Sequence, residues 1–190
     1  MLENLKKYDI VLASQSPRRQ ELLRGLDIPF TVRTIDVDEH YPAELQGQEI
    51  PLYLAELKSA ACNPVSNELI ITADTVVWLG NKVLGKPTDK ADAKRMLTAL
   101  SGNTHEVFTG VCLRSAEQKT SFVAATKVTF APLSPDEINY YLNRYHPLDK
   151  AGAYGVQEWI GYIGVEHIEG SYYNVMGLPI QRLYRELNKF

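Results

Sequence analysis

Residues 10–23 read IVLASQSPRRQELL, a stretch that combines an apolar run, a hydroxyl-rich turn and a helical pattern. Its first four residues form the short apolar run that is typical of a buried strand. Ser16 is a natural N-cap, and Pro17 fits the first helical position because the amide that proline lacks would be unpaired there. On the predicted helix, Arg19 lies at the start of the apolar face that the leucines of the following turns form. The stretch therefore predicts a strand, a tight turn and a helix whose N-terminus carries two arginines.

This helix N-terminus has two interpretations. Exposed N–H groups, the positive end of the helix dipole and two guanidinium groups would together bind a phosphate or a carboxylate. An ordinary capped helix with solvated arginines would have the same sequence. Both interpretations are compatible with the stretch taken alone.

The composition is that of a globular protein with one sizeable core. The chain has 190 residues, 45% of them apolar and 23% charged, and a net charge of −3. A negative net charge argues against a broad nucleic-acid surface, which normally needs a basic face. No apolar stretch is long enough to cross a membrane.

The N-terminus lacks the apolar core of a signal peptide, so we expect a cytoplasmic protein. Cys62 and Cys112 lie far apart without metal-ligand spacing, which favours reduced structural thiols. The four histidines are scattered, and we interpret them as structural or exposed.

Two further segments carry charges in suggestive places. A strand predicted over 30–35 is followed by Asp36, Asp38 and Glu39, which would form either a solvated loop or a divalent metal site of hard oxygen ligands. Pro51 begins the next predicted helix, and Lys58 lies on its apolar face. A lysine there either snorkels at the edge or reaches into a cleft, and periodicity alone favours snorkelling.

Asp74 is the most informative anomaly. It lies in the middle of LIITADTVVWL, residues 69–79, a β-branched run that predicts a buried strand. An unpaired carboxylate inside such a strand is costly, so it should be paired or bound to a cation. A structural salt bridge is one interpretation, and a strand that delivers Asp74 into a functional cleft is the other.

The rest of the chain alternates between helix and strand signals. After a turn at Gly80, Lys86 precedes a proline that holds it in extended geometry. Thr88 is expected to cap a helix that ends at Gly102. Further predicted elements are strands over 105–114 and 120–130, a helix that begins at a capping box over 134–137, a glycine-broken strand over 159–168 and a helix from 180.

We therefore predict an α/β fold with a long mixed β-sheet flanked by helices. A hairpin between the strands over 105–114 and 120–130 makes a purely parallel sheet improbable. No linker or repeat divides the chain, so residues 1–190 are expected to form a single domain with two lobes around an active-site cleft. The loop DKAGAYGVQ, residues 149–157, has small residues that would let its backbone approach a ligand, and a plain glycine loop would have the same sequence.

Four stretches of the chain resemble the Maf family of nucleotide pyrophosphatases. They are ASQSPRRQELL at 13–23, TADTVV at 72–77, LGKPTD at 84–89 and DKAGAYGVQ at 149–157, in the order of the family. The resemblance implies a Maf and inosine-triphosphatase-like fold with a central cleft. The chain departs from the family at Glu158 and Trp159, where a glycine often follows the glutamine.

The resemblance implies hydrolysis of nucleoside triphosphates to the monophosphate and pyrophosphate, as house-cleaning of nucleotide pools with a link to cell-division arrest. Asp74 would be the catalytic residue and Glu39 the ligand of a divalent cation, Mg²⁺ or Mn²⁺. The substrate-binding residues would be Ser14, Arg19, Lys58, Lys86 and Lys150. The alternative is a non-catalytic nucleotide-binding regulator of cell division, and a homodimer is left open.

Within the resemblance, Arg18, Thr75 and Gln157 occupy positions that divide the family by substrate. Their combination resembles the branch that acts on dTTP and UTP, in contrast to the branch that prefers 7-methyl-GTP. The alternative is that Thr75 only fills its strand and that Arg18 is solvated. The physics agrees, because a glutamine amide offers both a donor and an acceptor to the carbonyl–NH–carbonyl edge of uracil or thymine.

Overall fold

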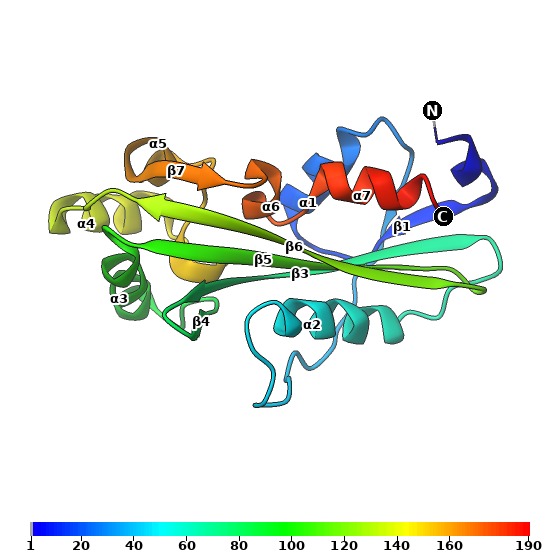
Figure 1. Cartoon of the computed structure of the whole chain (residues 1–190), viewed down its shortest axis with the longest axis horizontal. Helices are drawn as coiled ribbons and strands as arrows, with labels where there is room; N and C mark the ends of the chain where they lie inside the picture. The colour runs from blue at the N-terminus through cyan, green and yellow to red at the C-terminus, as the bar shows by residue number, and fades with distance from the viewer. Residues whose placement is uncertain (1) are drawn as a thin grey trace. The chain divides into compact units, whose positions relative to one another are not determined.

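The computed structural model describes residues 2–190 and contains a mixed sheet with flanking helices (Figure 1). Its strands are β1 (Asp9–Leu12), β2 (Thr31–Val32), β3 (Glu68–Leu79), β4 (Lys82–Leu84), β5 (Thr104–Arg114), β6 (Lys119–Phe130) and β7 (Val165–Glu169). Its helices are η1 (Glu3–Lys7), α1 (Pro17–Arg24), α2 (Glu49–Ala60), α3 (Lys90–Leu100), α4 (Pro135–Tyr145), η2 (Ala151–Ala153), α5 (Trp159–Gly164), α6 (Tyr172–Met176) and α7 (Ile180–Leu187).

Within the described residues the seven strands form one sheet in the order β2-β1-β3-β5-β6-β7, with β4 paired to β3. β1 is parallel to both β2 and β3, whereas β4 is antiparallel to β3 and β7 to β6. The predicted α/β class with a mixed sheet is therefore confirmed. β1 ends opposite Ile71, so β3 continues beyond the end of its neighbour and carries Asp74 there.

The chain divides into two compact units, and the boundary falls within the long strands. The first unit comprises Met1–Asp74, Thr109–Ala124 and Gly177–Phe190, and the second comprises Thr75–Phe108 and Ala125–Met176. Asp74 therefore ends the first segment of one unit, and Thr75 begins the other.

In the first unit, α2 lies on one face of the strands, and α1 and α7 lie on the other (Figure 1). Two close contacts join α2 to the strands. The Thr72 hydroxyl donates to the Ala55 carbonyl over 2.7 Å, and a Cβ on Gly110 would lie 2.2 Å from the Pro51 carbonyl oxygen. Only glycine permits β5 to approach α2 so closely.

In the second unit, one core joins α3, α4 and the strands around fully buried side chains such as Leu97, Phe130 and Tyr141. His105 Nε2 and the Tyr154 hydroxyl share a hydrogen bond of 2.8 Å. The His105 ring also packs edge-on against Phe130. Burial lowers the pKa of His105 to about 4, so this histidine is a neutral core residue, as expected.

Two boundary predictions are wrong for local reasons. The strand predicted over 30–35 is only Thr31–Val32, because it pairs with β1 at just two positions and both of its side chains are exposed. The helix predicted to begin at Pro51 begins at Glu49. Proline is tolerated in its first turn because the first amides of a helix have no intrahelical partner.

A third prediction is wrong because Asp89, and not Thr88, caps α3. The Asp89 carboxylate accepts from the Asp92 amide over 2.7 Å. Aspartate and threonine are both good N-caps, so the adjacent pair was ambiguous. The Thr88 amide instead donates to the Asp92 side chain.

A fourth prediction is wrong over 159–168, where a helix, α5, precedes the strand β7. A Cβ on Gly161 would lie 1.8 Å from the carbonyl oxygen of Val156, so this helical turn folds back onto the chain that leads into it. Gly161, one of the glycines of the predicted glycine-broken strand, is required by this tight reversal.

Candidate active site

The turn between β1 and α1 has the predicted geometry. Ser16 is the N-cap of α1, and its side chain accepts from the Arg19 amide. The Ser14 hydroxyl accepts from the Ser16 amide over 3.2 Å. Serine hydroxyls thus organise the turn and place Arg18 and Arg19 in the first turn of the helix.

Arg19 is anchored by a contact that the sequence did not predict. Its Nε donates to the Gly177 carbonyl over 2.8 Å, which ties α1 to the segment before α7. Burial lowers the pKa of the guanidinium, while the charges of Asp74 and Glu39 act in the opposite direction. Arg19 therefore lies within the electrostatic field of two of the predicted site residues.

Lys58 brings those two carboxylates together. Its ammonium Nζ lies 2.7 Å from Asp74 Oδ1 and 2.9 Å from Glu39 Oε1. Side chains two residues apart on a strand share a face, and Thr72 is already bonded to Ala55 of α2. Asp74 therefore faces α2 as well, one turn along from Ala55, where Lys58 lies.

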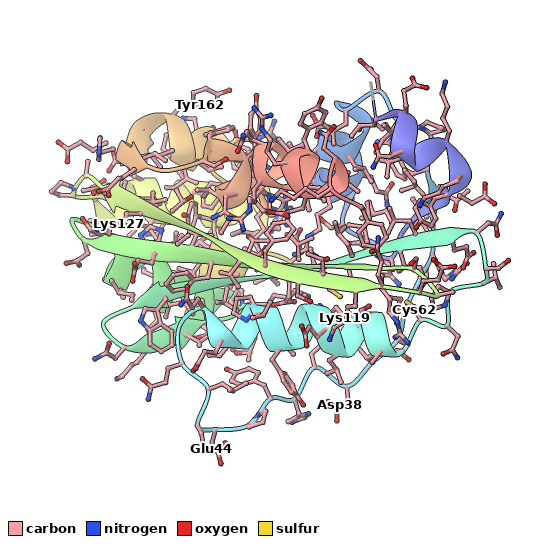
Figure 2. All side chains as sticks on the ribbon, turned by 45° about the vertical axis from the view of Figure 1, so that its right-hand side comes forward. Asp38, Glu44, Cys62, Lys119, Lys127 and Tyr162 are labelled. Carbon is pink, nitrogen blue, oxygen red and sulfur yellow. The ribbon has the colours of Figure 1, made fainter. Side chains whose placement is uncertain are left out.

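The three side chains of this cluster differ in their exposure to solvent. The Asp74 and Lys58 side chains are 11% and 13% exposed, whereas Glu39 is 47% exposed. Lys58 thus reaches a buried carboxylate and does not snorkel into solvent. Glu39 belongs to a loop outside α2, on which Figure 2 shows Asp38 and Glu44.

The carboxylates of this cluster are of the type that can hold a divalent cation. Two carboxylates converge on one ammonium, and hard oxygen ligands of this kind suit Mg²⁺, which commonly takes one or two carboxylates and completes its shell with phosphates and water. Among residues 2–190 there is no cluster of three or more histidine, cysteine, aspartate or glutamate side chains that could hold a metal by itself.

In the second unit, Lys150 and Gln157 lie in one tightly bonded loop. The Lys150 ammonium, whose side chain is 10% exposed, lies 2.8 Å from Asp149 Oδ1 and 3.1 Å from Glu158 Oε1. The Gln157 amide oxygen is buried and has no hydrogen-bond partner among the described residues. A buried acceptor of this kind calls for an explanation, and a bound ligand that brings a donor supplies one.

The same loop is joined to the segment that carries Lys86. The Gly152 amide donates to the Gly85 carbonyl over 3.1 Å, and Gly152 adopts a φ of 69°. Lys86 itself is exposed. Thr75 directly follows Asp74 on β3 and is half-buried, and its side chain points to the opposite face of the strand.

The predicted site residues therefore fall into two groups. The first unit brings together Glu39, Lys58 and Asp74, with Arg19 in their field, Ser14 in the β1–α1 turn and Arg18 in the first turn of α1. The second unit holds Thr75, Lys86, Lys150 and Gln157. Sequence reasoning missed Gly177, Glu158 and Tyr141 as bonded members of these groups, because their partners are distant along the chain.

The fold agrees with the family to which the chain belongs. A model of the family described as Maf-like protein matches residues 9–190, and the chain is a member of the Maf family. A dTTP/UTP pyrophosphatase of Bacteroides thetaiotaomicron is 59% identical over 192 residues and 100% of both chains. One of Flavobacterium johnsoniae is 50% identical over 187 residues, 97% of this chain and 96% of the relative.

A solved structure supports the fold independently. The Ham1 protein of Staphylococcus aureus superimposes with a TM-score of 0.54 at 15% identity, over 94% of this chain and 99% of that one. This likeness concerns the fold alone. Over residues 2–190, every helix is too short or too polar to span a bilayer.

Replacing Lys58 with methionine should destabilise the protein by about 3 kcal/mol, because Asp74 would remain as a buried carboxylate without its ammonium partner. The matched control is Lys119→Met. Lys119 lies on β6 (Figure 2), and its ammonium forms an exposed ion pair of 3.1 Å with Glu56, which lies on α2 as Lys58 does. That change should cost less than about 1 kcal/mol. Urea unfolding measures both, and equal losses would contradict the importance of the Lys58–Asp74 pair.

Proposed function

We propose that this chain is a nucleoside triphosphate pyrophosphatase that hydrolyses dTTP and UTP to the monophosphate and pyrophosphate. Its membership of the Maf family supports this proposal, as do the full-length relatives named dTTP/UTP pyrophosphatase. The observation that carries it is the buried Asp74 carboxylate, held by Lys58 close to Glu39 and within the field of Arg19. Such a combination of acid and cation suits hydrolysis at a phosphate.

The cations provide the electrostatic part of the proposed reaction. A nucleoside triphosphate carries about four negative charges, and more charge develops on the leaving pyrophosphate. Arg19 and Lys58 are held in place before the substrate arrives, so little reorganisation accompanies the reaction. Ser14, Lys86 and Lys150 are proposed to contribute further substrate contacts.

Asp74 is proposed as the general base. Lys58 holds Oδ1, so the second carboxylate oxygen would accept a proton from a water molecule. The water oxygen then forms a bond to the α-phosphorus, and the bond between the α-phosphorus and the bridging oxygen breaks. The electron pair of that bond leaves with pyrophosphate, and the proton is retained by Asp74 until it returns to solvent.

A divalent cation, Mg²⁺ or Mn²⁺, is proposed to be held by Glu39. When bound, such an ion polarises phosphoryl oxygens and neutralises developing charge. We also propose a cytoplasmic location and a role in nucleotide-pool house-cleaning. Cys62 and Cys112 are free and buried, which supports a reducing compartment.

A non-catalytic nucleotide-binding regulator of cell division is the alternative. Such a protein would use the same cations but would have no need of a buried carboxylate beside them. Incubation with dTTP or UTP and Mg²⁺, followed by assay of released pyrophosphate, separates the two. Absence of pyrophosphate with every triphosphate tested would overturn the proposed hydrolysis.

Asp74→Asn should lower turnover by at least ~10²-fold, the scale of a general-base contribution, while nucleotide binding is largely retained. The amide keeps the shape of the carboxylate and removes its capacity to accept the proton. Turnover and binding are measured in parallel, with a melting curve as the control for folding. Near-normal turnover would exclude Asp74 as the base.

Removal of divalent cations by EDTA should abolish turnover, and added Mg²⁺ or Mn²⁺ should restore it. Glu39→Gln should raise the metal concentration needed for half-maximal rate by about tenfold, because one charged ligand is lost. Glu44→Gln, a change of an exposed residue of the same loop, is the control and should change nothing. Full turnover in EDTA would show that the reaction needs no metal.

Gln157→Glu should reduce turnover of dTTP and UTP by ~10-fold or more, since a mismatched buried polar pair costs roughly 1–3 kcal/mol. A carboxylate cannot donate to a pyrimidine carbonyl as an amide does. Gln181→Glu, at an exposed position of α7, is the matched control. Wild-type protein that turned over 7-methyl-GTP faster than either pyrimidine nucleotide would overturn the assigned base preference.

A further inference from the structure

The Glu158 carboxylate is bonded on both of its oxygens. Oε1 lies 3.1 Å from the Lys150 ammonium, and Oε2 accepts a hydrogen bond from the Tyr141 hydroxyl. The Glu158 side chain is only 21% exposed.

Tyr141 connects the Glu158 carboxylate to the backbone of the loop. Its hydroxyl accepts from the Gly155 amide over 3.1 Å while it donates to Glu158. Tyr141 is fully buried, and burial together with the hydrogen bond to Glu158 raises the pKa of its hydroxyl well above the usual value. The hydroxyl therefore stays protonated and acts as a fixed bridge between Gly155 and Glu158. Successive hydrogen bonds of this kind strengthen one another.

In the turn over 155–158, the first and last residues contact each other through both backbone and side chain. The Glu158 amide donates to the Gly155 carbonyl over 3.0 Å, and a Cβ on Gly155 would lie 2.8 Å from the Glu158 Cδ. The Glu158 side chain thus folds over Gly155, the first residue of the turn, and a side chain at that position would require Glu158 to move. Gln157 is the residue immediately before Glu158, so its position depends on this turn.

We propose that Glu158 is a positioning residue that sets the orientation of Gln157 and thereby the preference for a pyrimidine base. It acts through Tyr141 and Gly155 and does not itself contact the substrate. Lys150, which lies between Asp149 and Glu158, serves as the counter-ion of this carboxylate. The inference rests on the proposed function, because it concerns the nucleotide that the protein selects.

The test measures binding, which requires no turnover. Dissociation constants for the α,β-imido analogues of dUTP and dGTP are determined by calorimetry with Mg²⁺, and their ratio reports base selection because the two ligands differ only in the base. Glu158→Ala should reduce the preference for the dUTP analogue about tenfold, the effect of one lost hydrogen-bonded contact. Glu158→Gln, which can still accept from Tyr141, should stay within about threefold of wild type.

Two further variants separate positioning from a general loss of structure. Tyr141→Phe removes only the bridging hydroxyl and should reproduce the effect of Glu158→Ala, and the double variant should be no worse than either, because both remove one chain of contacts. Glu166→Ala, an exposed change on β7, is the control and should leave the ratio unchanged. Melting curves check that each variant is folded.

The outcomes of this test are distinct from those of the pyrophosphatase assay. An unchanged ratio in folded Glu158→Ala protein, or effects of Glu158→Ala and Tyr141→Phe that multiply in the double variant, would overturn the inference. Wild-type protein that bound both analogues equally would overturn it as well, because there would be no preference to set. Failure to release pyrophosphate, in contrast, would overturn the proposed function alone.

Discussion

The ion pair between Lys58 and Asp74 is the interaction on which the first unit depends. A carboxylate in a β-branched strand must be compensated, and Lys58 lies within 2.7 Å of it. This requirement fixes the register between α2 and β3, which the bond from Thr72 to Ala55 supports one helical turn earlier. The Lys58 ammonium of this pair also contacts the carboxylate of Glu39, which lies on an exposed loop. A single ammonium thus organises a helix, a strand and a loop around the carboxylate.

In the second unit, the buried charge that needs a partner is a cation. Lys150 is nearly buried and is compensated by Asp149 and Glu158. The same Glu158 also receives the Tyr141 hydroxyl, so charge compensation and loop geometry depend on one side chain. In both units, a buried charge is satisfied by partners that also shape the adjacent backbone.

The local features of the chain could be predicted because their physics is local. Ser16 and Pro17 form the expected start of α1, and the capping box at Ser134 and Glu137 is present. The hairpin strands and the terminal helix follow their apolar periodicity. The failure at α5 has a definite cause, because glycines that relieve a tight reversal look the same in sequence as glycines that interrupt a strand.

The alternation of strands and helices, the family and the anomaly at Asp74 are all evident in the order of the residues, since caps, periodicity and a charge in an apolar run act within a few residues. The partner of each charged group, in contrast, is evident only in the folded chain. Lys58 was one of several lysines that could have met Asp74, and the anchoring of Arg19 on Gly177 joins residues 158 positions apart. Such pairs depend on the register of packed elements, which no local pattern encodes.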